Sequence, residues 1–173
     1  MKDIAKHLTY PIYLIKYNCF KQKENGGYMG NDYEALRLEN QLCFPLYAAS
    51  RNITSLYTPV LKPMGLTYTQ YLVFLVLWEK DGVPVGEICE KLMLDNGTLS
   101  PLLKKMEHAG YVERKRNPED DRVVIITLTK QGKDLKKAAK DIPSKVGGCI
   151  RLPADKAKQL YSLLYELLGN TEQ

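Results

Sequence analysis

The chain has 173 residues, of which 45% are hydrophobic and 26% charged, and its formal net charge is +5. This size and composition are typical of one globular domain and exclude a chain that is disordered throughout. No apolar run approaches the roughly 18–20 residues that cross a bilayer, so we expect a cytoplasmic protein with no membrane partner. The mild basic excess permits a polyanionic partner without requiring one.

The four cysteines, Cys19, Cys43, Cys89 and Cys149, are widely scattered and form no C-x-x-C pair. This spacing excludes a zinc ribbon or a thioredoxin-like motif at the level of sequence. The chain has only two histidines, so we expect no metal and no cofactor.

Residues 1–31 are interpreted as an N-terminal extension, disordered or not part of the natural protein. A signal peptide is disfavoured, because polar residues and Pro11 interrupt the apolar stretch Leu8–Ile15. The residues Gly26-Gly27-Tyr28-Met29 can be encoded by a ribosome-binding sequence followed by a start codon. We therefore hypothesise that the natural chain starts at Met29.

Residues 32–173 are expected to form one mainly helical domain with a small β-hairpin wing. Asp32 is predicted to cap a long helix whose apolar residues recur every three or four positions. Pro45 predicts a kink or a late start of this helix, and Pro63 with Gly65 ends it. The apolar positions are Leu38, Leu42, Leu46, Ala49, Ile53, Leu56 and Val60.

Three short helices are predicted next, over residues 69–80, 85–94 and 98–108, and a hairpin follows them. Its strands are expected at 111–116 and 122–128, joined by a turn over 117–121. Thr129 begins another helix, and the last one covers 155–168. Two short helices followed by a hairpin indicate a winged helix-turn-helix, with residues of about 66–128 binding DNA.

The DNA-binding residues are expected on the second short helix and on the hairpin. Leu99, Leu102, Leu103 and Met106 would face the core. The free N–H groups at the start of the helix would add affinity for phosphate. Asp120 is predicted to orient Arg122 by a bidentate ion pair, so that Arg122 enters the minor groove. The predicted DNA-binding residues are Asn96, Thr98, Ser100, Pro101, Lys104, Arg114, Lys115, Arg116 and Arg122.

Three segments carry a family resemblance: LENQLCF at 38–44, LDNGTLSPLLKKME at 94–107 and RKRNPEDDR at 114–122. Over residues of about 34–169 the chain resembles the MarR family of winged-helix repressors, in particular the OhrR-type organic hydroperoxide sensors. The resemblance implies a homodimer that binds double-stranded operator DNA. It also implies dimerisation through the N- and C-terminal helices, at about 34–62 and 129–169.

The resemblance further implies that Cys43 is the redox-sensing thiol, and that Tyr57 and Tyr68 stabilise its thiolate. Cys43 and Tyr57 would be about 21 Å apart along one straight helix, so the tyrosine is expected from the partner subunit. Both tyrosines could instead be simple packing residues. Cys149 matches the resolving thiol of some relatives, which implies an intersubunit disulfide with Cys43, although a loop cysteine can be incidental. Cys89 is expected to be an inert core residue.

Three functions are compatible with these residues. The leading one is a repressor that releases its operator when an organic hydroperoxide oxidises Cys43. A second is a MarR-type repressor that responds to a small phenolic or lipid ligand. The third is a thiol peroxidase, which is disfavoured because no basic residue is adjacent to Cys43; we therefore expect no enzyme.

Overall fold

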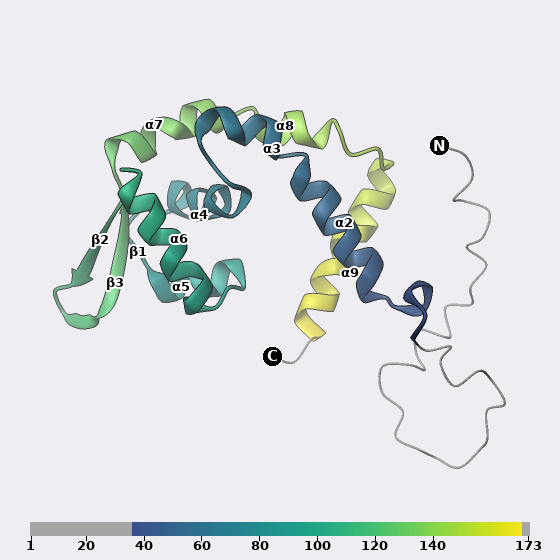
Figure 1. The fold of residues 1–173 in the computed structure, drawn as a ribbon, viewed down its shortest axis with the longest axis horizontal. Helices are drawn as coiled ribbons and strands as arrows, with labels where there is room; N and C mark the ends of the chain where they lie inside the picture. The colour runs from purple at the N-terminus through teal and green to yellow at the C-terminus, as the bar shows by residue number, and fades with distance from the viewer. Residues whose placement is uncertain (1–35, 171–173) are drawn as a thin grey trace, which may run out of the picture. The chain divides into compact units, whose positions relative to one another are not determined.

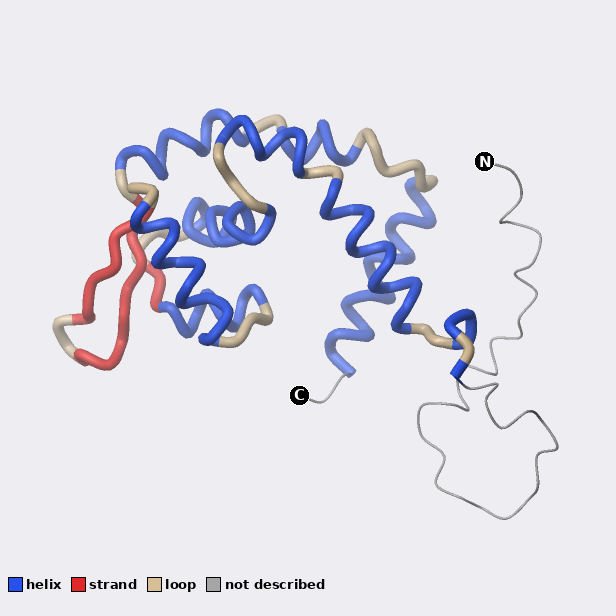
Figure 2. The backbone as a smooth tube through the Cα atoms, viewed as in Figure 1, coloured by secondary structure: helices blue, strands red, loops and turns tan. Residues whose placement is uncertain are grey.

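The computed structural model describes residues 36–170, a mainly helical chain with one small sheet (Figures 1 and 2). The chain divides into two compact units, with the boundary between Asn52 and Ile53. Asp32, Cys19 and the proposed start at Met29 lie outside the described residues. No single helix within residues 36–170 is long and apolar enough to span a membrane, although the bent pair Cys43–Met64 and Tyr68–Glu79 passes that test when taken together.

The first helical stretch is shorter and more broken than expected. A 3-10 turn, η3 (Leu38–Asn40), precedes α2 (Cys43–Ser55). Pro45 lies in the first turn of α2, where its missing N–H is tolerated, so the predicted late start is confirmed. The predicted continuation to Val60 is wrong: Pro59 lacks the N–H that would bond to the Ser55 carbonyl, and a separate helix, α3 (Thr58–Leu61), begins there.

The second unit contains the winged helix-turn-helix, which confirms the expected fold class. After η4 (Lys62–Met64) come α4 (Tyr68–Glu79), β1 (Val83–Pro84), α5 (Val85–Leu92) and α6 (Asn96–His108). Gly65, at φ 70°, ends η4 as the sequence predicts. Thr67 and Gln70 form a capping box, which fixes the start of α4.

The three strands form one antiparallel sheet in the order β1-β3-β2. The hairpin consists of β2 (Val112–Asn117) and β3 (Asp120–Leu128), which Figure 2 shows projecting from the helices. Its turn is shorter than predicted, since Asn117 already pairs with Asp120. The strand β1 escaped prediction because its two residues pair only with the distant Ile125 and Ile126.

The chain continues from the sheet into α7 (Lys130–Ala139), α8 (Ile142–Gly147) and α9 (Ala154–Asn170). The core of the second unit lies between α4, α5, α6 and the sheet, and α8 inserts two side chains into it. Its fully buried large residues include Phe74, Leu61, Leu77, Ile88, Leu99, Leu103, Met106 and Ile126, and α8 contributes Ile142 and Val146. Leu99, Leu103 and Met106 are buried as predicted, and Leu102 packs against this core.

Candidate DNA-binding surface and thiol sites

The turn between α5 and α6 is closed by backbone hydrogen bonds at the end of α5. Met93 adopts the left-handed conformation with φ 51°, and the Leu94 N–H donates to the Cys89 carbonyl at 3.0 Å. Asp95 then caps α6: its Oδ1 accepts from the Thr98 N–H at 2.8 Å, and its Oδ2 accepts from the Thr98 hydroxyl at 2.7 Å. These bonds lower the pKa of Asp95, the side-chain bond from Thr98 most strongly.

This cap removes one N–H group from those expected to bind phosphate. The Thr98 N–H is already occupied by Asp95, and the negative carboxylate opposes a phosphate at the same place. The missed signal was in the sequence, since Asp three residues before Thr98 is a common N-cap arrangement.

The predicted polar residues of α6 lie on its accessible side. The Ser100 hydroxyl donates to Asn96 Oδ1 at 2.7 Å, so Asn96 keeps its amide hydrogens for other partners. Such donors suit the acceptor atoms of base edges in the major groove. Asn96, Thr98, Pro101 and Lys104 are exposed, whereas Ser100 is half-buried.

The hairpin presents a highly exposed arginine, Arg122, near its tip. The Arg122 side chain is 92% exposed, and its Nε lies 3.2 Å from Asp120 Oδ1. The same Oδ1 accepts from the Arg122 N–H at 3.0 Å. The predicted contact between Asp120 and Arg122 is thus present. The prediction that it is bidentate is wrong, because only Oδ1 of Asp120 takes part. Of the other predicted wing residues, Lys115 pairs with Glu113 at 2.6 Å and Arg116 donates to the Asp121 carbonyl at 2.9 Å.

Arg114 lies differently from the other wing arginines. Its side chain is only 24% exposed, and Nη1 lies 3.7 Å from Glu107 Oε2 of α6. Glu107 also accepts from the Arg114 backbone N–H at 3.2 Å. This double contact braces the hairpin against α6, a role that the sequence reasoning missed because it treated Arg114 only as a DNA contact.

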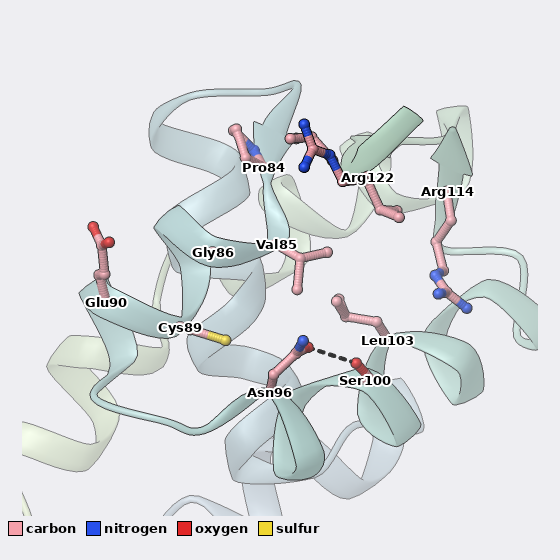
Figure 3. A pocket seen from close by; sticks show the side chains of 12 residues that line it. Pro84, Val85, Gly86, Cys89, Glu90, Asn96, Ser100, Leu103, Arg114 and Arg122 are labelled. Atoms are coloured by element: carbon pink, nitrogen blue, oxygen red, sulfur yellow. Dashed lines mark hydrogen bonds between the residues drawn. The ribbon is translucent and has the colours of Figure 1, made fainter. Parts of the chain in front are cut away.

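A cavity of about 570 Å³ lies between α5, α6 and the hairpin (Figure 3). Arg114 Nε is buried there without a hydrogen-bond partner. Cys89, which is half-buried and packs against the core, also lines this cavity. Its other lining residues include Val85, Asn96, Ser100, Leu103 and Arg122.

The predicted redox-sensing cysteine is an exposed free thiol at the first residue of α2. The separation of about 21 Å expected between Cys43 and Tyr57 assumed one straight helix. The structure has no such helix, because α2 ends at Ser55 and Tyr57 immediately precedes α3.

Tyr57 and Tyr68 pack together in the second unit, with ring centroids 4.7 Å apart. Tyr71, one helical turn after Tyr68 and missed by the sequence reasoning, lies 5.8 Å from Tyr57. Burial, followed by the neighbouring tyrosines, raises the pKa of Tyr68 and Tyr71, so both phenols remain protonated donors at neutral pH.

Cys149 is an exposed free thiol just beyond α8. Its Sγ donates to the Lys145 carbonyl at 3.4 Å, at the C-terminal end of that helix. Only Gly147 and Gly148 separate Cys149 from Val146, which is buried in the core.

The helix α9 exposes an apolar surface of unusual size. Seven large side chains of this helix are at least 37% exposed, namely Leu160, Tyr161, Leu163, Leu164, Tyr165, Leu167 and Leu168. A surface of this kind on a globular protein marks an interaction site.

The fold and the polar face of α6 define a winged helix-turn-helix DNA-binding protein, and comparisons identify its family. The chain is 47% identical over 145 residues to the organic hydroperoxide resistance transcriptional regulator of Bacillus subtilis (strain 168), covering 84% of this chain and 99% of that protein. Residues 55–139 match a family model described as transcriptional regulator SarA/Rot.

Solved structures agree with this similarity. Reduced AbfR bound to DNA is 40% identical with a TM-score of 0.65, covering 79% of this chain and 94% of that chain. Disulfide-formed AbfR is 38% identical with a TM-score of 0.56, covering 78% and 95% of the two chains. AbfR is a protein of Staphylococcus epidermidis. The present chain belongs to the MarR family of winged-helix transcriptional regulators, and the relatives named above are regulators rather than enzymes.

Proposed function

We propose that this protein is a cytoplasmic, homodimeric repressor that releases operator DNA when an organic hydroperoxide oxidises Cys43. The observation that carries the proposal is the exposed, free Cys43 thiol at the start of α2, in a chain closely similar to an organic hydroperoxide regulator. The DNA-bound AbfR structure supports operator binding through the same fold.

Cys43 begins a helix, whereas Cys149 follows the C-terminal end of one, and this difference supports different roles for the two thiols. Cys43 is the exposed first residue of α2, whereas the Cys149 thiol lies beyond the end of α8 and donates to the Lys145 carbonyl. The Cys43 thiolate attacks the peroxide, so an S–O bond forms, the O–O bond breaks and an alcohol leaves. In this reaction sulfur is oxidised by two electrons. The phenols of Tyr57 and Tyr68 are the proposed donors to the thiolate and to the departing oxygen.

The Cys149 sulfur then attacks the Cys43 sulfenic acid of the partner subunit, so an S–S bond forms and water leaves. Only Gly147 and Gly148 separate Cys149 from the buried Val146, so this approach also displaces the end of α8. Overoxidised AbfR is reported bound to DNA, whereas AbfR also forms a disulfide. We infer by analogy that the disulfide, and not the added charge on one sulfur, weakens operator binding here.

The homodimer is supported by the exposed helices. The structure buries no residue of α2, and leaves every assigned residue of α9 exposed. Isolated helices of this length are marginal in water, so a second copy of the chain is the proposed cover for their apolar faces.

The proposed DNA contacts are Asn96, Thr98, Ser100, Pro101 and Lys104 on α6, with Lys115, Arg116 and Arg122 on the wing and Asp120 holding Arg122. Arg114 is assigned instead to bracing the hairpin, because Glu107 holds it and little of it is exposed. The affinity for DNA should fall steeply with salt, because each phosphate contact releases counterions.

The test measures binding to DNA selected by the reduced protein from a random-sequence pool, before and after addition of cumene hydroperoxide. We expect wild type to lose affinity and to form a crosslinked dimer on a non-reducing gel. Cys43→Ser should bind DNA but not respond, Cys149→Ser should form no crosslink, and Cys89→Ser should behave as wild type. A response in Cys43→Ser would instead favour a ligand sensor, and continued turnover of hydroperoxide would favour a peroxidase.

A further inference from the structure

The end of α4 and the first turns of α7 are joined by two hydrogen bonds of opposite direction. Trp78 Nε1 donates to the Gly132 carbonyl at 3.0 Å, and Lys136 Nζ donates to the Trp78 carbonyl at 2.7 Å. Trp78 also stacks on Phe74 of the core, with ring centroids 4.9 Å apart. We call this arrangement the α4–α7 clamp.

The clamp lies close to the base of the wing. The Thr129 hydroxyl donates to the Gly110 carbonyl at 2.6 Å and accepts from the Gly132 N–H at 3.1 Å. Gly132 itself approaches the Tyr111 backbone so closely that a Cβ atom would lie 2.2 Å from the Tyr111 oxygen. The first turn of α7 is therefore packed against both α4 and the residues that begin β2.

Beyond the clamp, α7 and α8 lead towards Cys149 through buried residues. Ala139, Ile142 and Val146 are all at most 4% exposed. A displacement of Cys149 therefore acts on a helix seated in the core rather than on a long flexible linker. When Cys149 is displaced, α7 either tilts away from α4 or moves together with α4.

We propose that Trp78 is a positioning residue for operator release: through the α4–α7 clamp it makes α4 and the DNA-binding elements follow α7 when Cys149 forms its disulfide. This inference rests on the proposed function. Without the clamp, α7 keeps its contacts with Gly110 and Tyr111 but moves with less effect on α4, the crosslink still forms, and α6 keeps more of its affinity for DNA. The clamp can couple the two events only by as much free energy as its own contacts supply.

The experiment separates crosslinking from release. Wild type, Trp78→Phe, Lys136→Met and the double variant are compared for disulfide yield and for the ratio of DNA affinities in the reduced and oxidised forms. Phe preserves the stacking on Phe74 but deletes the N–H donor. Lys137→Met is the matched control, because Lys137 is an exposed neighbour whose ammonium makes no bond to any described residue.

In wild type, the DNA affinity of the reduced form should exceed that of the oxidised form by about 5–150-fold, the range typical of coupled sites. We expect Trp78→Phe and Lys136→Met each to lower this ratio by about fivefold, the equivalent of one hydrogen bond. Their disulfide yield and reduced-state affinity should match wild type, as should every property of Lys137→Met. If Trp78→Phe does not fold, Lys136→Met alone decides the question.

A wild-type ratio in both clamp variants would overturn the role of Trp78 and leave the proposed function standing. If oxidised wild type keeps its affinity for DNA, the proposed function and the inference both fall; if it loses affinity without crosslinking, the inference falls and oxidation of Cys43 alone accounts for release. Fluorescence gives a second readout, since Trp78 is the only tryptophan in the chain. Its emission should change little on oxidation of wild type, because the clamp stays closed; a shift to the spectrum of solvated tryptophan would contradict the inference.

Discussion

Substitution of Gly132 by alanine tests the close approach between α7 and the base of the wing. A Cβ atom at this position would lie 2.2 Å from the Tyr111 oxygen and 3.1 Å from Leu128 Cδ2. The first neighbour is backbone, so relief requires α7 or the start of β2 to move. That movement also weakens the hydrogen bonds that Gly132 makes with Trp78 and Thr129.

The expected change in the free energy of unfolding is the balance of three contributions. Overpacking costs about 1–3 kcal/mol and each weakened hydrogen bond about 1 kcal/mol, whereas alanine gains up to about 1 kcal/mol of helix propensity over glycine. We therefore expect Gly132→Ala to lower the free energy of unfolding by about 2–4 kcal/mol.

Gly86→Ala is the matched control, because Gly86 is also helical and a Cβ atom there would meet nothing within 4 Å. This variant should be as stable as wild type or gain up to about 1 kcal/mol. Urea unfolding followed by circular dichroism, at equal protein concentrations, measures both. Equal unfolding midpoints for Gly132→Ala and wild type would refute the steric reasoning.

Three further predictions concern charge and assembly. Asp81 is partly buried, which raises its pKa, but bonds from Leu128, Lys133 and Gly82 outweigh this and lower it. Its stabilising contribution is therefore complete above the unfolded pKa of about 4 and is lost as the pH falls through the lower folded value. Asp81→Asn should lower the free energy of unfolding by about 1 kcal/mol at pH 7, after allowance for solvent screening, and by progressively less below pH 4. The exposed Asp134→Asn is the control variant, and a pH-independent cost for Asp81→Asn would contradict the reasoning. Arg122→Ala should reduce the salt slope of DNA binding by about 2 per dimer, whereas Asp120→Asn, which keeps the Arg122 charge, should leave most of it; an unchanged slope in Arg122→Ala would exclude Arg122 from the contact. Leu163→Glu on α9 should shift the protein towards monomer in sedimentation, whereas Lys156→Glu should not; a fully dimeric Leu163→Glu would exclude this face as the interface.

The sequence predicted those parts of the fold that depend on local periodicity and capping. The predicted ends of α4, α5, α6 and the two hairpin strands lie within two residues of the observed ones. Local signals failed where distant segments decide the structure. The strand β1 exists only because β3 pairs with it, and the loop expected before the last helix contains α8, which is held by the burial of Ile142 and Val146 in the core.

The same distinction holds for the candidate site. Residue type and spacing were sufficient to predict that the side chains of Asn96, Thr98 and Arg122 are exposed. They could not show that Arg114 is held by Glu107, or that Trp78 bonds to a residue 54 positions later. Those contacts depend on how the hairpin and α7 pack in three dimensions.

The edges of the small sheet bear on how this protein behaves when many copies crowd together. The strand β1 has two residues, one of them Pro84, so it offers at most one backbone N–H to a foreign strand. The other edge, β2, carries Glu113, Lys115 and Arg116. Beyond its pairing with β1, the outer edge of β3 begins with the charged residues Asp120, Asp121 and Arg122, so a long hairpin can protrude into solvent with charges along its open edges that disfavour strand addition.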